Sequence, residues 1–179
     1  TDIELNENGI RQAGVLAEAL RAEGFRPARI YTSPMKRAFH TARIVADALH
    51  AECVPRQGLE EIRFGLWEGM TWDQVEKDYP EEFRLWYDNR RYQRPPQGES
   101  YQDLLNRMLP VLQDIILREG GPDACCDVLV VAHSASMMSL QSWINGTPFH
   151  EMVARYRTKN AGSLPLDAGR IMQWKGPEA

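Results

Sequence analysis

The histidine at position 133 stands where a strand is expected to end, and it is the first candidate for chemistry in this sequence. It follows an apolar run rich in β-branched residues, Val128-Leu129-Val130-Val131, and it precedes Ser134 and further small residues. The run predicts a buried strand that leads into a helix. Two chemistries use a polar residue at such a turn: Ser134 as a nucleophile, or His133 as a partner of a phosphate group.

The serine hypothesis depends on the stretch AHSAS, which has the small-x-Ser-x-small frame of a nucleophile elbow. Both elbow glycines are replaced, by Ala132 and Ser136. A base histidine should follow, and His150 is the only one downstream. Little chain lies between Ser134 and His150 for another strand and an acid loop, so the pattern disfavours a serine hydrolase.

The phosphate hypothesis makes His133 the working group and requires cations and an acid. Arg37 lies at the start of an expected helix, just after Ser33-Pro34. Glu60 and Glu61 lie in a glycine-containing loop, LEEIRFGLWEG. A carboxyl group held beside arginines can protonate a leaving oxygen as a general acid. Taken singly, each of these residues is as well explained by a structural or solvated role.

Strand-like and helix-like segments alternate along the chain and position these candidates. Residues 29–33 and 127–133 predict strands, residues 53–69 look irregular, and residues 162–174 suggest a terminal hairpin. Helical spacing covers residues 5–24, 34–50, 100–120 and 134–146, and helical pieces broken by Pro80 lie within residues 71–99. This alternation predicts an α/β fold with a mainly parallel sheet. Ligands bind such sheets beyond the carboxyl ends of the strands, where helix N-termini favour anions.

Local signals mark the ends of these helices. Asn6 is expected to cap the first helix, and Ser100 the long one, with Asp103 three residues on in a weakened capping-box pattern. Gly24 and Asn145-Gly146 are expected to end two helices. Pro34 is expected in a first helical turn, and Pro110 is expected to kink the long helix.

Composition restricts the class of protein. A chain of 179 residues is typical of one domain, and a net charge of −4 gives no reason to expect a nucleic-acid or membrane partner. The first residues have neither the basic start nor the apolar stretch of a signal peptide. Cys53, Cys125 and Cys126 form neither a disulfide framework nor a zinc spacing, which favours a reducing cytoplasm.

Five blocks of sequence together resemble the histidine phosphatase superfamily, the phosphoglycerate-mutase-like enzymes. In order they are LNENGIRQA, YTSPMKRAFHTARIVADAL, LEEIRFGLWEGMTWDQV, PPQGESYQDLLNRMLPVL and VLVVAHSASMMSL. The chain looks most similar to the branch that includes α-ribazole phosphatase and broad-specificity phosphatases. The resemblance implies a three-layer α/β/α sandwich in a single domain spanning residues 1–179. Residues 70–100 would form a lid or substrate-facing insertion.

The same resemblance implies roles for individual residues. Arg37 matches a phosphate-binding arginine, Glu61 the proton donor, and His133 the second catalytic histidine, whose imidazolium would stabilise phosphate oxygens with Arg37. Ser134 would contribute mainly its backbone near the phosphate. Glu68-Gly69 and the Gly98-Glu99-Ser100 stretch match positions that shape and support the site.

The implied function is a metal-independent phosphatase that hydrolyses small phosphomonoesters through a phosphohistidine, with no cofactor. The family's nucleophile belongs to an Arg-His-Gly motif after a first strand, and this sequence has no Arg-His-Gly. We therefore expect that segment upstream of Thr1. His40, His50 and His150 are not evident replacements and are expected to be structural or exposed.

Three alternatives remain open. A mutase would use the same site, although the short segment between Gly69 and Gly98 favours a phosphatase. A phosphate-binding pseudoenzyme would lack the nucleophile, and a serine hydrolase would use Ser134. The substrate is expected to be a small phosphorylated metabolite. Three arginines in a polar, proline-rich stretch are expected to contact the acidic parts of this substrate: Arg90, Arg91 and Arg94. The same stretch also fits a solvated surface. The sequence leaves the oligomeric state open.

Overall fold

The computed structural model describes residues 2–124 and 127–177, and within these residues three parallel strands form a sheet. The strand order is β2 (Glu52–Pro55), β1 (Arg29–Thr32), β3 (Leu129–Val131). In this register Tyr31 of β1 lies opposite Val54 of β2 and Val130 of β3. The predicted α/β class with a parallel sheet is therefore confirmed.

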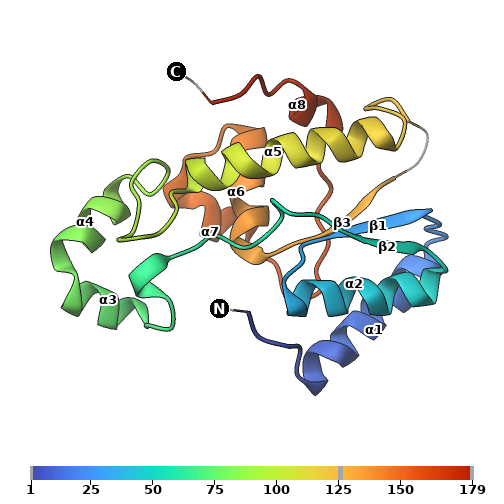
Figure 1. Ribbon diagram of the computed structural model, residues 1–179, viewed down its shortest axis with the longest axis horizontal. Helices are drawn as coiled ribbons and strands as arrows, with labels where there is room; N and C mark the ends of the chain where they lie inside the picture. Colours follow the sequence, from blue (N-terminus) through green and yellow to red (C-terminus); the bar gives the residue numbers. More distant parts are fainter. Residues whose placement is uncertain (1, 125–126, 178–179) are drawn as a thin grey trace.

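Helices cover both faces of the sheet (Figure 1). One layer contains α1 (Glu7–Ala22) and α2 (Lys36–Leu49), and the other contains α5 (Tyr101–Arg118), α6 (Ser134–Asn145) and α8 (Ala168–Met172). Since side chains alternate along a strand, Ile30 of β1 packs into the α1–α2 layer and Tyr31 into the α5 layer. This is the three-layer sandwich that the resemblance implied.

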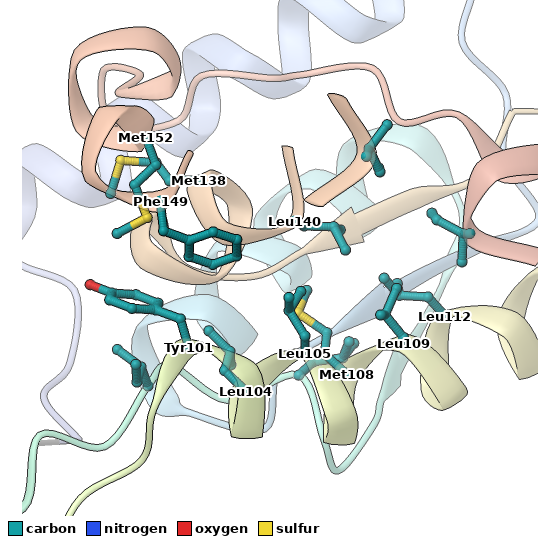
Figure 2. Packing of buried hydrophobic residues seen from close by; sticks show 14 of the residues in the cluster. Tyr101, Leu104, Leu105, Met108, Leu109, Leu112, Met138, Leu140, Phe149 and Met152 are labelled. Carbon is teal, nitrogen blue, oxygen red and sulfur yellow. The ribbon is translucent and has the colours of Figure 1, made fainter. Parts of the chain in front are cut away.

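The larger core lies along one apolar face of α5. Figure 2 shows this face directed toward α6 and the segment that follows it. That segment contains a 3₁₀ turn, η2 (Phe149–Glu151), and the short helix α7 (Met152–Tyr156). The face is almost fully buried because apolar residues recur every three to four positions: Tyr101, Leu104, Leu105, Met108, Leu109 and Leu112.

An aromatic cluster organises the segment between Gly65 and Asp88. It contains a 3₁₀ turn, η1 (Gly65–Trp67), and the helices α3 (Trp72–Asp78) and α4 (Pro80–Asp88). Trp72 and Trp86 stack with their ring centroids 5.1 Å apart, and Trp67 meets Trp86 edge-on at 5.7 Å. As predicted, the helical pieces are broken at Pro80, which is the first residue of α4. That this segment serves as a lid stays a prediction.

The predicted ends of the helices are largely confirmed. The Asn6 side chain accepts from the Gly9 N–H at 2.9 Å, and Ser100 and Asp103 form a complete capping box. Gly24 and Gly146 follow their helices with φ of +80° and +64°. Pro34 does not lie in a first turn, since α2 begins at Lys36 with Met35 as its N-cap. Pro110 lies inside α5, and the kink stays a prediction.

Two expected segments differ from the structure. Residues 53–69 were expected to be irregular, but the backbone of Glu52–Pro55 pairs with β1 as strand β2. Residues 162–174 were expected to form a hairpin, but they contain α8, which Asp167 caps by accepting from the Arg170 N–H. The alternation in these residues predicted strands, but the capping side chain of Asp167 and the short apolar stretch after it stabilise a helix instead.

Strand β3 is less buried than the apolar run predicted. Each of its three residues is half-buried instead of buried. Within the described parts of the chain, β3 pairs with β1 alone, so its other edge has no strand beside it.

None of the described helices is long and apolar enough to cross a bilayer. Cys125 and Cys126 lie outside the described residues, and Cys53 is a free thiol.

Two glycines let the loop containing Glu61 lie backbone to backbone against the segment before α5. Gly65 has φ of +60°, and a Cβ there would lie 2.1 Å from the Pro96 carbonyl oxygen. A Cβ on Gly98 would lie 2.7 Å from the Arg63 carbonyl oxygen. The Leu66 N–H donates to that Pro96 oxygen at 3.0 Å. The close approach requires residues without side chains.

We therefore expect Gly65→Ala to destabilise the protein far more than Gly69→Ala. Gly69 has φ of +84° with nothing within 4 Å of its Cβ position, so alanine there costs about 1–2 kcal/mol for backbone conformation alone. Gly65→Ala adds a backbone clash and should cost about 3 kcal/mol or more. Urea unfolding of the two variants measures the difference, and equal losses would show that the close approach is unimportant.

Candidate active site

The carboxylate of Glu61 lies against the N-terminus of α6. Its Oε2 accepts from the Ala135 N–H at 3.2 Å, and its Oε1 accepts from the Ser136 N–H at 3.1 Å and the Ser136 hydroxyl at 2.9 Å. The first turn of a helix has free N–H groups and a partial positive charge, which together favour an anion. The loop acid and the helix that follows His133 therefore meet directly.

His133 is the N-cap residue of α6 and connects two strands. Its Nε2 lies 2.8 Å from the hydroxyl of Ser33, which is fully buried at the end of β1. The Ser33 N–H donates to the Val131 carbonyl at 2.9 Å, and its Oγ accepts from the Met35 N–H at 3.2 Å. The histidine ring is thus fixed at the carboxyl edge of the sheet, between β1 and β3.

Met35 brings Arg37 toward the same place. Its Sδ accepts from the Glu61 N–H at 3.5 Å and lies 3.9 Å from Nη2 of Arg37. Arg37 also lies close enough to His133 for its charge to act on the imidazole. The structure therefore brings Arg37, Glu61 and His133 together at the carboxyl edge of the sheet, and their chemical roles stay predictions.

Burial lowers the pKa of His133 to about 3, and the charges of Arg37 and Arg107 add to that effect. Asp2 acts in the opposite direction but does not compensate. The ring is therefore neutral near pH 7 in this structure, whereas the resemblance implied an imidazolium. A dianionic phosphate beside the ring would favour the charged form again.

Arg107 of α5 holds the backbone of the Glu61 loop. Its Nη1 donates to the carbonyl oxygens of Gly58 and Glu60, and its Nη2 donates to that of Glu61, each at 3.0 Å. The remaining N–H groups, on Nε and Nη2, donate to the two carboxylate oxygens of Glu99 at 3.0 Å. All five guanidinium donors are thus engaged.

Glu99 is the buried anchor of this arrangement. Besides Arg107, its carboxylate accepts from the backbone N–H of Arg63 at 3.1 Å and from the Arg63 guanidinium at 3.2 Å. Burial alone raises the pKa of Glu99, but the hydrogen bonds and charge of Arg107 outweigh it and hold the pKa below its usual range. The carboxylate therefore stays ionised and keeps the loop fixed.

Other predicted residues have different surroundings. Ser134 is the exposed first residue of α6, and His150 lies in η2, which follows the other end of that helix. Glu60 accepts from the Gly58 N–H at 2.7 Å. The described residues hold no group of three or more His, Cys, Asp and Glu side chains arranged for a metal.

The three arginines of the proline-rich stretch are held in different ways. Arg90 stacks over Trp86 and Tyr87, each at 4.9 Å, and Arg91 stacks over Tyr92 and Phe149 at 5.1 and 5.2 Å. Both line a cavity of about 280 Å³.

Arg94, by contrast, makes a two-fold ion pair with Asp103 at 2.6 and 2.7 Å. This ion pair lowers the pKa of Asp103 to about 2. A role of Arg94 in substrate binding would compete with this pairing.

Sequence reasoning missed the residues that support the site. Arg107 lies 46 residues from Glu61 in the chain, and no motif links the two. Ser33 was seen only as a polar residue at a strand end, and Ser136 only as a replaced elbow glycine. The position of Ser136, two residues into a helix after a strand-tip histidine, was the available signal.

The chain matches the family model of the histidine phosphatase superfamily (branch 1) over residues 1–168. It is 35% identical over 142 residues to a 6-phosphofructo-2-kinase/fructose-2,6-bisphosphatase of Gallus gallus, covering 79% of this chain and 28% of that protein. It is 33% identical over 139 residues to phosphoserine phosphatase 1 of Hydrogenobacter thermophilus, covering 78% of this chain and 63% of that protein.

Solved structures give the same result. A mycobacterial glucosyl-3-phosphoglycerate phosphatase in complex with VO3 matches with a TM-score of 0.75 and 29% identity, over 89% of this chain and 77% of that one. α-Ribazole phosphatase structures share the fold at 24% identity. The chain therefore belongs to the histidine phosphatase superfamily, as the five sequence blocks predicted. It spans 28% of the length of the first of these two curated relatives and 63% of the second.

The depressed pKa of His133 predicts that stability falls with acid. Since the pKa is lower in the folded state than the ordinary 6.5, the unfolded chain binds more protons below pH 6.5. Stability should fall by about 1.4 kcal/mol per pH unit below that value. Urea unfolding between pH 5 and 7.5 should give a flatter profile for His133→Gln. His150→Gln, at an exposed site, is the control, and parallel profiles for His133→Gln and the unsubstituted protein would contradict this account.

Proposed function

We propose that this domain hydrolyses small phosphomonoesters through a phosphohistidine intermediate. The observation that carries the proposal is the placement of Glu61, which lies at the N-terminus of α6 beside His133 and Arg37. An acid, an imidazole and a guanidinium at one anion-favouring helix end suit phosphoryl transfer, in which positioning and charge stabilisation supply most of the catalysis. Membership of the histidine phosphatase superfamily supports the same chemistry.

The proposed reaction has two steps. A histidine upstream of Thr1 attacks phosphorus, an N–P bond forms, the bond to the leaving oxygen breaks, and Glu61 gives its proton to that oxygen. Water then attacks phosphorus, the N–P bond breaks, and the ionised Glu61 takes the proton from water. Arg37 and His133 stabilise the equatorial oxygens, and the incoming phosphate favours the charged form of His133.

The free edge of β3 supports this placement of the nucleophile. Within the described residues β3 has a partner on one side only, and its residues are half-buried. A parallel strand added there would end beside His133, because carboxyl ends of parallel strands meet at one edge. An Arg-His-Gly motif at that end would face Glu61 and Arg37.

Arg90 and Arg91 are candidates for binding the acidic part of a substrate. No ion pair with a carboxylate is formed by either guanidinium among the described residues, and both line the same cavity. The charge of Arg90 and that of Glu61 both act on Tyr101, so Arg90 is not remote from the proton donor. We propose a small phosphorylated metabolite with a further anionic group as the substrate class. A reducing cytoplasm is the proposed location.

The test uses the complete gene product and rapid quench with an activated aryl phosphate. We expect acid-labile phosphate on a histidine upstream of Thr1, located by peptide mapping. Glu61→Gln should lower turnover by about 10²–10⁴-fold and accumulate the phosphoenzyme, because water must then attack the phosphohistidine without a general base. Phosphorylated metabolites with and without a second acidic group would then define the substrate.

Two variants separate the competing roles. His133→Ala should lose about 3 kcal/mol of transition-state stabilisation, by comparison with the loss of one oxyanion donor. Ser134→Ala should retain most activity. Label on His133 or Ser134, or equal losses in the two variants, would overturn the proposed function. Return of the phosphoryl group to an alcohol rather than water would indicate a mutase.

A further inference from the structure

The two oxygens of Glu61 have unequal surroundings. Oε1 accepts three hydrogen bonds, from the Ile62 N–H at 3.1 Å, the Ser136 N–H at 3.1 Å and the Ser136 hydroxyl at 2.9 Å. Oε2 accepts one, from the Ala135 N–H at 3.2 Å. A proton on Oε1 would point at the three groups that donate to this oxygen and would disrupt their hydrogen bonds. A proton on Oε2 leaves the three hydrogen bonds to Oε1 intact.

We propose that Ser136 is a positioning residue that fixes Oε2 of Glu61 as the oxygen that gives and takes the proton. This inference rests on the proposed function, because it specifies how the acid of that reaction is presented. Ser136 contributes two of the three donors to Oε1, one from its backbone and one from its side chain.

The hydroxyl of Ser136 is well placed for this role. Ser136 is fully buried, so water does not replace its hydrogen bond. Its Oγ also lies 3.4 Å from the Glu60 carbonyl oxygen, so donation to Glu61 is the shorter of two available bonds. Arg107 fixes the carbonyl groups of Glu60 and Glu61, and this holds the loop while the carboxyl group changes its protonation.

Comparison of leaving groups tests the proposal. An alkyl phosphate needs a proton on its leaving oxygen, whereas a dinitrophenyl phosphate does not, so misplacement of the acid should affect only the first. In the complete gene product, Ser136→Ala should lower kcat/KM for the alkyl ester about tenfold relative to the dinitrophenyl ester. If Ser136 had a merely structural role, Ser136→Ala would lower kcat/KM equally for the two esters.

The matched control is Ser142→Ala, which removes another buried hydroxyl from α6. The Oγ of Ser142 has no hydrogen-bond partner among the described residues, so this variant should leave the ratio between the esters unchanged. Ser136→Thr keeps the hydroxyl and should restore the ratio relative to Ser136→Ala. An unchanged ratio in Ser136→Ala would overturn the proposal.

A second measurement does not depend on activity. In an atomic-resolution crystal structure at acid pH, a protonated carboxyl group shows one longer C–O bond. We expect the longer bond to be the one to Oε2 of Glu61, and a longer bond to Oε1 would overturn the assignment even in an active enzyme. If neither ester is hydrolysed by the unsubstituted protein, the proposed function fails while this measurement still decides the role of Ser136.

Discussion

The contact between the half-buried Arg107 and the buried Glu99 is the constraint on which the candidate site depends. One guanidinium donates to three backbone carbonyls of the Glu61 loop and to both oxygens of one carboxylate. A planar group with five fixed donors can satisfy this set, and a lysine cannot. Because a buried charge without its partner is strongly unfavourable, the two residues and the loop are fixed as a unit.

The rest of the site follows from that fixed loop. With its carbonyls held by α5, the loop presents the Glu61 carboxylate to the N-terminus of α6. The close approach of Gly65 and Gly98 keeps the loop against the segment that carries Glu99. His133 shares the turn between β3 and α6, where burial and the nearby guanidinium groups keep it neutral until an anion arrives. The guanidinium of Arg107 therefore both fixes the loop and contributes to keeping His133 neutral.

Much of the fold could be predicted because its signals are local. Asn6 and the Ser100–Asp103 pair cap their helices through side chains three residues away, and the apolar spacing of α5 indicates its buried face. α8 was missed because the alternation in residues 162–174 favoured a hairpin, and β2 was missed because its four residues gain stability from β1, which is distant in the chain. The same holds for Arg107, whose spacing from Glu61 carries no periodic signal. Arg37, Glu61 and His133 were found by family resemblance, whereas their supports required the three-dimensional structure.

Amide hydrogen exchange in Arg107→Lys tests the central claim most directly. Lysine keeps a positive charge beside Glu99 but cannot bridge three carbonyls, so the loop should loosen while the fold persists. Exchange should become about tenfold faster at the amides of Gly58, Ile62 and Arg63, whose hydrogen bonds hold the loop. A tenfold increase corresponds to a loss of about 1.4 kcal/mol in the free energy of local opening. Amides of β1 and α2 should be unchanged, and Arg56→Lys, which alters the ion pair with Asp114, is the control. Unchanged protection of those loop amides in Arg107→Lys would contradict the account.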